Sequence, residues 1–397
     1  MANPAPARKE DAGYILFERA FRLFFPGAAL FAAIAIPLWV FTLKTDLETP
    51  SGFLARDYHA HEMIFGYLGA VLAGFLFTAM PNWTGRPALA GVRLAFLFVL
   101  WLAGRLAIFT SASWPTAAVV IDAGFLLTVS SLAWKDVLAG GSVRNMPVCL
   151  LVSLLAITNI VFDFALLQGA DTGWTERSSL AIIATLISLI GGRVIPNFSG
   201  NWMKKNNIAP LPAPFSLFDK AVLTATVITL TSWIITPDTS FTGYLFFITF
   251  FAHAIRLLRW RGWQTTAEPL VLILHIGYLW LVLWFGLTSL AILSPALFSL
   301  SSALHALTAG AIGTMTMAIM TRAILGHSDR KLSADGTTRI IYTLIVVGTF
   351  VRVFAQSFSL DFMLATAISG TLWSAGFLLF TLTYGPYCLS PKKPPHQ

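Results

Sequence analysis

Residues 301–330, SSALHALTAGAIGTMTMAIMTRAILGHSDR, decide the fold, because they contain an apolar run long enough to cross a lipid bilayer as one helix. Between the two histidines of this stretch, His305 and His327, the only charged side chain is Arg322. Helix packing does not require a buried imidazole, so both histidines are candidate functional residues. Small residues on the same helix allow a neighbouring backbone or a flat cofactor to come close. They are Ala306, Ala309, Gly310, Ala311 and Gly313.

The composition of the whole chain indicates a membrane protein. Of the 397 residues, 56% are hydrophobic and only 11% are charged, and the mean hydropathy is +0.75. A water-soluble globular protein carries about 25% charged residues. The apolar runs have roughly 20 residues, which is the length of a helical span rather than of a β-barrel strand. We therefore expect an integral membrane protein surrounded by the lipid bilayer.

The apolar runs predict twelve membrane-spanning helices. They are expected at residues 22–43, 61–80, 92–110, 114–134, 147–168, 178–197, 219–236, 241–258, 268–292, 296–323, 338–357 and 361–384. The longest loop is expected at residues 198–218, where prolines favour a connector. The predicted fold class is an all-α, polytopic membrane bundle. It has a cytoplasmic N-terminal segment (1–21), a single transmembrane domain (22–385) and a cytoplasmic tail (386–397).

Basic residues are distributed unevenly between the two predicted sides of the membrane. The side of the N-terminus carries twenty Lys and Arg residues, the opposite side carries Lys44, Arg56 and Arg177, and three more fall inside apolar runs. Because cytoplasmic loops are enriched in Lys and Arg, both termini are predicted to be cytoplasmic. The same bias explains the net charge of +8, so nucleic-acid binding is not expected.

Two further features of the sequence argue against a cleaved signal peptide and against cysteine-based cofactor sites. The first 21 residues are polar and the first apolar run is long enough to be a retained span, so no cleaved signal peptide is expected. The two cysteines, Cys149 and Cys388, form neither a Cys-x-x-Cys nor a Cys-x-x-Cys-His motif. Covalent haem attachment and thiolate zinc sites are therefore not expected.

A motif that occurs twice in the sequence predicts three four-helix repeats. The motif PNWTG at residues 81–85 ends the second predicted span, and PNFSG at residues 196–200 ends the sixth. The offset is 196 − 81 = 115 residues, or four spans. Arg105 in the third span and Arg352 in the eleventh fit the same period. The alternative interpretation is that Pro and Asn merely end helices.

The second span begins with the motif DYHAHEM at residues 57–63. On a regular helix His59, Glu62 and Met63 share one face, and His61 points about 160° away. The two imidazoles could bind one ion only if residues 57–60 were extended.

Polar residues within the spans form two groups by predicted depth. The first group is biased to the periplasmic half and predicts a polar cluster there: Arg105, Asp122, Asn159, Asp163, His305 and Arg352. The second group lies nearer to the cytoplasm: Arg193, Asn197, His253 and His275. His253 is close to a basic loop, so we interpret it as a residue that faces the lipid headgroups.

Neutral imidazole suits haem iron, copper and zinc in an apolar setting. The candidate metal ligands are His59, His61, His275, His305 and His327. The alternative is a set of hydrogen-bonded core histidines, or histidines that line a solute path.

A guanidinium inside a membrane needs a partner. The candidate cofactor-binding residues are therefore Arg105, Arg193 and Arg352, because guanidinium can bind haem propionates bidentately. For Arg105 and Arg352, Asp122 or Asp163 is the alternative partner.

Several segments resemble the NnrS family of bacterial membrane proteins. They are RAFRLFFPGAALFA (19–32), DYHAHEMIFGYLGAVLAGFLFTAMPNWTGRPAL (57–89), GGRVIPNFSGNW (191–202), RLLRWRGWQT (256–265), LHIGYLWLVL (274–283) and HALTAGAIGTMTMAIMTRAILGHSDR (305–330). The resemblance covers nearly the whole chain. It implies a twelve-span inner-membrane protein that contains haem b and copper and serves in nitric oxide metabolism, denitrification or resistance to nitrosative stress.

The resemblance carries over to individual histidines only where the motifs match. His59, His61, His275, His305 and His327 stand in matching motifs, and His253 lies just outside one. The resemblance does not assign these histidines to haem or to copper.

The twelve spans and the predicted repeats are also similar to the haem–copper oxidase core subunit. That core carries His-x-His on its tenth span, whereas His305 is followed here by Ala306 and Leu307. This departure argues against an oxidase-type binuclear centre and against oxygen reduction.

Three functions remain open at this stage. The first is a haem- and copper-binding protein that handles nitric oxide. The second is a transporter of protons, metal ions or a small solute, with His305, Asp122 and Arg105 along its path. The third is a non-catalytic protein that protects, or delivers metal to, a partner that handles nitric oxide. The sequence does not decide whether the protein is an enzyme.

Overall fold

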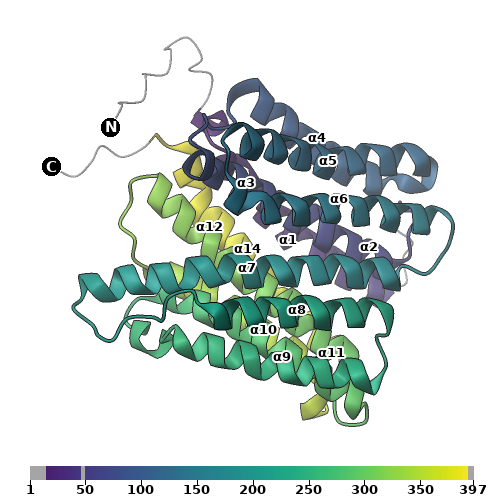
Figure 1. Cartoon of the computed structure of the whole chain (residues 1–397). Helices are drawn as coiled ribbons and strands as arrows, with labels where there is room; N and C mark the ends of the chain where they lie inside the picture. Colours follow the sequence, from purple (N-terminus) through teal and green to yellow (C-terminus); the bar gives the residue numbers. More distant parts are fainter. Residues whose placement is uncertain (1–14, 46–49, 392–397) are drawn as a thin grey trace.

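The computed structural model describes residues 15–45 and 50–391. In this part of the chain, twelve helices are long and apolar enough to cross a membrane, and there is no strand. The helix axes run roughly parallel to one another, and the start of α1 and the end of α14 lie at the same end of the bundle (Figure 1). The predicted fold class, an all-α multi-pass membrane bundle, is confirmed.

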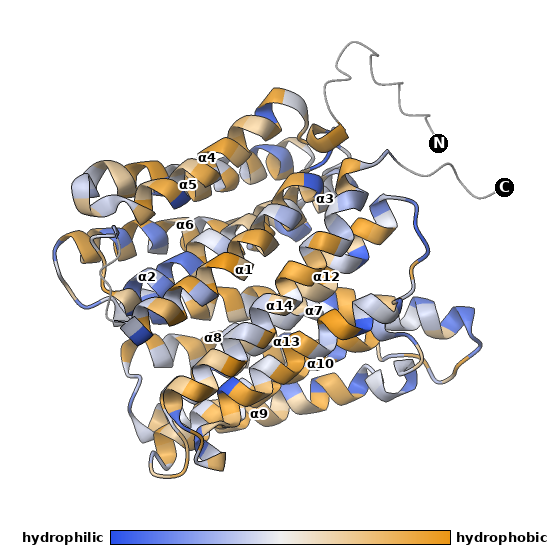
Figure 2. Cartoon of the chain, turned by 180° about the vertical axis from the view of Figure 1, so that it is seen from behind, coloured by the Kyte–Doolittle hydropathy of each residue, from blue (hydrophilic) through white to orange (hydrophobic). Residues whose placement is uncertain are grey.

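The observed spans overlap all twelve predicted ones. They are α1 (Ala20–Thr45), α2 and α3 (Ala55–His61 and Leu68–Thr84, joined by the π-helical turn Glu62–Tyr67), α4 (Gly91–Phe109), α5 (Pro115–Ala139), α6 (Met146–Leu167), α7 (Gly173–Lys205), α8 (Leu217–Ile235), α9 (Ser240–Arg259), α10 (Pro269–Leu293), α11 and α12 (Leu300–His305 and Gly313–His327, joined by the π-helical turn Ala306–Ile312), α13 (Gly336–Phe354) and α14 (Phe362–Leu389). Hydrophobic residues cover most of their length, and hydrophilic residues gather at helix ends, in loops and on α2 (Figure 2).

Local sequence explains where several spans begin. Ser216 and Asp219 form a reciprocal capping box at the start of α8. At the starts of α9, α11, α13 and α14 an oxygen-bearing side chain accepts a hydrogen bond from a backbone N–H of the first turn. These capping residues are Thr239, Ser299, Asp335 and Asp361.

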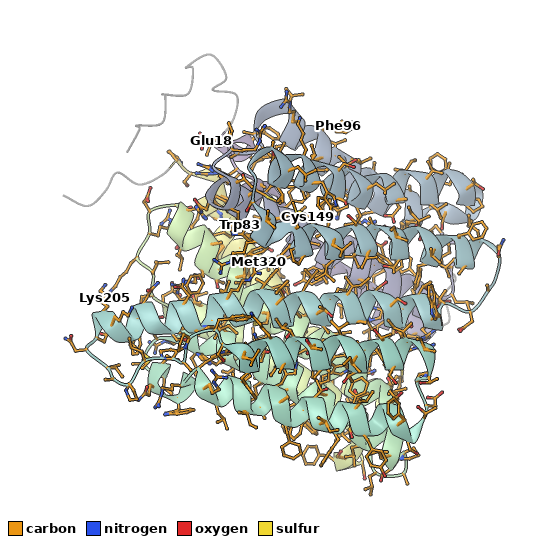
Figure 3. The ribbon with its side chains drawn as sticks, in the orientation of Figure 1. Glu18, Trp83, Phe96, Cys149, Lys205 and Met320 are labelled. Carbon is orange, nitrogen blue, oxygen red and sulfur yellow. The ribbon has the colours of Figure 1, made fainter. Side chains whose placement is uncertain are left out.

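The predicted end of the sixth span is wrong. Helix α7 continues through Pro196 to Lys205, which lies at the far tip of the helix in Figure 3. A proline inside a membrane helix is tolerated when neighbouring groups satisfy the freed carbonyl. By contrast α3 does end soon after Pro81, because Gly85 takes a left-handed conformation and its N–H binds the Pro81 carbonyl. The similar PN motifs therefore end one helix and not the other.

Four spans form the interior of the bundle. The most apolar windows of the spans that contain α3, α7, α10 and α12 are 61–78% buried, against 33–44% in the other eight spans. Helices α3, α7 and α12 belong to the second, sixth and tenth spans, which are the spans that the predicted repeat makes equivalent. The repeat itself stays a prediction.

The first and last spans close the bundle. Helix α14 packs against both α1 and α13. The buried guanidinium of Arg22 on α1 donates hydrogen bonds to the carbonyls of Cys388 (2.7 Å) and Ser390 (2.8 Å) at the end of α14. These bonds hold the two ends of the described chain together.

Candidate functional site

A cavity of about 530 Å³ lies at the end of the bundle opposite to the termini. Its walls come from α1, α2, α7, α11, α13, α14 and the two π-helical turns. Two predicted metal ligands, His59 and His305, and one predicted cofactor-binding residue, Arg352, line it together. We call it the His59–His305 cavity. Its volume falls within the range of about 300–1,000 Å³ that ligand and cofactor sites occupy.

His59 presents its imidazole ring to this cavity from α2. The ring stacks on the indole of Trp39, with 4.0 Å between the ring centroids and 19° between the planes. No hydrogen bond to the His59 ring nitrogens is found among the described residues. Stacking therefore fixes the plane of the ring and leaves its nitrogens available to a ligand.

His305 reaches the cavity from α11 with a defined tautomer. Its Nδ1 lies 2.7 Å from the carbonyl oxygen of Ser301, one turn earlier on the same helix. A carbonyl oxygen can only accept, so Nδ1 carries the proton and Nε2 keeps its lone pair. An imidazole that binds a metal through one ring nitrogen is usually oriented by a hydrogen bond from its other ring nitrogen.

Arg352 brings positive charge to the cavity wall. It interacts electrostatically with both His59 and His305. Its guanidinium lies 5.5 Å from the ring centroid of Phe362, and it makes no ion pair with an acidic residue in the described part of the chain. Arg56 also lines the cavity but is already paired with Glu176 at 2.6 Å. Arg352 is therefore the cation that an anionic ligand would meet.

Small residues form part of the wall, but of the five small residues noted in the tenth span only Ala309 is among them. Ala309 from the π-helical turn, Gly348 from α13 and Gly370 from α14 all line the cavity. The neighbouring Gly310 packs on Trp280 instead, where a Cβ atom would lie 2.8 Å from the indole. The two glycines of the wall let these helices pack closely, because a Cβ atom at Gly348 would lie 3.1 Å from the backbone of α14 and one at Gly370 would lie 3.2 Å from Ile36 Cγ2.

A second group of polar side chains lies separately from this cavity. It consists of six buried residues, which we call the ion cluster: His61, Glu62, Arg105, Asp122, Asn159 and Asp163. His61 Nδ1 lies 3.0 Å from Glu62 Oε1, and Arg105 Nη1 donates to the same oxygen at 2.5 Å. Arg105 Nη2 donates to Asp122 Oδ1. The alternative partner considered for Arg105, Asp122, is therefore the one that the structure shows.

Two glycines make room for the ion cluster. A Cβ atom at Gly66 would collide with the Arg105 guanidinium and lie 3.1 Å from Glu62 Oε2. A Cβ atom at Gly104 would lie 3.0 Å from Asp122 Oδ1. Gly66 lies one turn after Glu62, and Gly104 directly precedes Arg105. A glycine this close to a charged residue in a membrane span is the sequence signal that could have pointed to this packing.

The two histidines of the DYHAHEM motif do not share a site. Residues 55–61 are helical, so the extended lead-in that could have brought His59 and His61 to one ion does not form. His59 and Met63 line the cavity together, which confirms their predicted common face. The prediction that Glu62 shares that face is wrong, because its carboxylate turns to His61 and Arg105.

Two further histidines lie elsewhere in the bundle. His275 is buried, its Nε2 lies 2.8 Å from the Ser199 hydroxyl, and its Nδ1 has no hydrogen-bond partner among the described residues. His253 is fully buried between Thr226 (2.9 Å) and Tyr278 (2.7 Å). The interpretation of His253 as a headgroup-facing residue is therefore wrong.

The remaining candidates are also outside the cavity. His327 stacks on Phe21 with 5.5 Å between the ring centroids. Arg193 donates to the Asn145 side chain and to the Arg144 carbonyl, both at 3.4 Å. Of the eight candidate residues, the structure thus gathers His59, His305 and Arg352 in one place and His61 and Arg105 in another.

The comparison with family models decides the relationship. The model described as NnrS protein matches residues 15–392, nearly the whole chain. The chain belongs to the NnrS family. A comparison with curated proteins gives no match. Membership of the NnrS family fits a membrane protein with a role related to nitric oxide.

Proposed function

We propose that the His59–His305 cavity binds haem b and that the protein handles nitric oxide there. The observation that carries the proposal is the convergence of two imidazoles and one guanidinium on a cofactor-sized cavity, where the guanidinium has no acidic partner among the described residues. His305 would be the better iron ligand, because its Nδ1–H bond to Ser301 leaves Nε2 as the electron-pair donor. Arg352 would bind a propionate bidentately.

The rest of the wall suits a flat apolar cofactor and a small uncharged ligand. Ile36, Leu43 and Leu304 supply apolar surface, and Ala309 presents only a methyl group there. Ferrous haem, when bound, supplies an iron atom to which nitric oxide binds. The side chains hold the cofactor, neutralise its propionates and limit access of water.

Copper has a possible donor pair on the same wall. His59 and Met63 lie one turn apart and both line the cavity. Imidazole and thioether are donors that suit Cu(I). We propose that these two residues hold copper when His305 serves the haem, because one imidazole cannot ligate both metals through the same nitrogen.

The proposed membrane location and orientation of the protein are based on the distribution of its basic residues. Twenty Lys and Arg residues on the side of the termini favour a bacterial inner membrane with both termini in the cytoplasm. The cavity would then lie in the periplasmic half. Nitric oxide from either compartment or from the lipid can reach such a site, which suits a role in nitrosative stress or denitrification.

The optical spectrum of the purified protein tests the proposal. Protein made in haem- and copper-replete cells should be coloured, and its Soret band should shift when nitric oxide is added to the reduced form. His305→Ala should lose the haem, whereas His327→Ala, outside the cavity, should keep it. Colourless wild-type protein, or full haem content in His305→Ala, would contradict the proposal.

The alternative functions have less support from the geometry. A transport path through His305, Asp122 and Arg105 would have to join two separate groups of residues. A protein that only delivers metal to a partner would show no consumption of nitric oxide on its own. Consumption by the isolated protein with an electron donor would therefore exclude that role.

A further inference from the structure

The ion cluster carries more negative charge than its neighbours neutralise. It contains three carboxylates, Glu62, Asp122 and Asp163, and one guanidinium, Arg105, all at most 5% exposed. With a neutral His61 the formal charge is +1 − 3 = −2. In the described part of the chain, Arg105 is the one permanent cation that contacts these carboxylates. Burial of uncompensated charge is strongly unfavourable, so a missing positive charge is indicated.

In its neutral form, the histidine of the cluster has the tautomer of a metal ligand. Glu62 Oε1 lies 3.0 Å from His61 Nδ1, and Arg105 donates to the same oxygen. A carboxylate that is already held by a guanidinium accepts from Nδ1–H and leaves Nε2 with its lone pair. This carboxylate–histidine arrangement is the usual support for a metal-binding imidazole.

Three polar atoms crowd the free nitrogen, His61 Nε2. Asp163 Oδ1 lies at 2.9 Å, Asp122 Oδ2 at 3.2 Å and Asn159 Nδ2 at 3.4 Å. One ring nitrogen cannot satisfy two carboxylates, and beside a neutral ring protonated at Nδ1, Asp163 Oδ1 has no hydrogen-bond donor within the described residues. A lone pair that faces two carboxylate oxygens is repelled unless a cation lies between them.

The spacing of these donors matches a coordination shell. Ligand atoms at 2.0–2.2 Å from one ion lie roughly 3.0–3.5 Å apart in tetrahedral or octahedral geometry. The three candidate atoms from His61, Asp122 and Asp163 all lie within 4.8 Å of one another. Small adjustments of these side chains therefore suffice to surround an ion.

We propose that His61, Asp122 and Asp163 bind a divalent cation, in a centre separate from the His59–His305 cavity. One imidazole nitrogen with carboxylate oxygens suits Mn²⁺, Fe²⁺ or Zn²⁺ and, lacking sulfur, disfavours Cu(I). Glu62 and Arg105 position His61 and do not ligate the ion. Asn159 donates hydrogen bonds to Asp122 (3.0 Å) and Asp163 (3.1 Å) and orients both carboxylates.

Mn²⁺ binding to the full-length protein in detergent tests the proposal. After removal of metals with EDTA, unbound Mn²⁺ is measured by electron paramagnetic resonance at room temperature. The wild type should take up one Mn²⁺ per chain, and added Zn²⁺ should displace it. Asp163→Asn should weaken Mn²⁺ binding at least tenfold. The matched control is Asp136→Asn, whose carboxylate pairs with Arg86 outside the cluster and which should bind like the wild type.

Thermal unfolding separates a lost ligand from a misfolded protein. Mn²⁺ should raise the unfolding midpoint of the metal-free wild type and leave that of Asp163→Asn unchanged. Metal-free Asp163→Asn should be at least as stable as the metal-free wild type, because it carries one buried negative charge fewer. If Asp163→Asn does not accumulate, His61→Gln takes its place in the same measurements.

Two outcomes would overturn the proposal. One is a wild type that neither binds Mn²⁺ or Zn²⁺ nor changes its unfolding midpoint, which would mean that protons neutralise the cluster. The other is unchanged metal binding in Asp163→Asn or His61→Gln. The haem content of each variant is measured in parallel and should equal that of the wild type, so failure here is distinct from failure of the haem proposal.

Discussion

Helix α2 contributes one histidine to the His59–His305 cavity and another to the ion cluster, and these two residues, His59 and His61, are only two positions apart. His59 meets open space, a stacked indole and an arginine with no acidic partner. His61 meets four polar side chains within 3.4 Å. A large cavity lined by groups that can still bind a ligand suits an organic cofactor. Closely packed carboxylate oxygens that outnumber their cations suit a metal ion. One helix thus contributes to two kinds of site because its two histidines lie on opposite faces.

The sharpest test of this separation is the pair His305→Ala and His61→Gln. The first should reduce bound haem by more than about tenfold, because it removes the oriented Nε2 donor. The second should leave haem content unchanged, because His61 does not line the cavity. Haem is quantified by the pyridine haemochrome spectrum of purified protein. Equal haem loss in both variants would show that the two regions form one centre.

The two membrane arginines should differ most in stability. Arg105→Leu should lower the free energy of unfolding by about 3–5 kcal/mol, because it leaves buried carboxylates without their cation. Arg352→Leu should cost less than about 1 kcal/mol in haem-free protein, because no buried carboxylate depends on it. Unfolding in a mixed detergent series measures both. Similar losses would mean that Arg352 has a structural partner.

Glycine substitutions test how tightly the ion cluster is packed. Gly66→Ala should destabilise the protein by about 1–3 kcal/mol, because its Cβ would strike the Arg105 guanidinium. Gly326→Ala is the matched control, since the nearest atom to its Cβ would be Leu332 Cδ2 at 3.7 Å. That change should be neutral or stabilise α12 by up to about 1 kcal/mol. A tolerant Gly66 would indicate that Arg105 can move away from the cluster at little cost.

The smallest effect is expected on the cavity side. Trp39→Leu removes the stacked indole from His59 and should cost about 0.5–1.5 kcal/mol. Because His305 keeps its own bond to Ser301, haem should still bind. The released His59 ring should shift the Soret band of the nitric oxide adduct. The control is Trp114→Leu, because Trp114 is exposed in another loop. An unchanged spectrum in both would place His59 away from the bound ligand.

The sequence was a good guide to the spans and a partial guide to the sites. Twelve helices follow from hydropathy because a bilayer demands long apolar runs with internally paired backbones. The end of α7 was missed because Pro196 can lie inside a packed membrane helix. Helical periodicity placed His59, Glu62 and Met63 on one face. This was right for His59 and Met63 and wrong for Glu62, because the Arg105 guanidinium on α4 attracts its carboxylate.

Other parts of the sites had no signal in a single sequence. Nothing nearby in the chain links Trp39 to His59, although the two rings stack in the structure. The predicted polar cluster held His305 and Arg352 together with Asp122. Helix pairing divides them, because α4, α5 and α6 lie on one side of α2 and the His59–His305 cavity lies on the other. The depth of a residue in the membrane can be predicted from hydropathy. The direction in which its side chain points around the bundle depends on which helices pair.

The two π-helical turns, Glu62–Tyr67 and Ala306–Ile312, each directly follow a histidine of one of the two sites. Such a turn holds one residue more than the α-helical turn it replaces. One residue can therefore be lost from it without displacing either end of the helix. Among related chains we expect single-residue gaps at these two places before any other point within the spans. Chains with such a gap should have a straightened helix and a histidine turned away from its ligand.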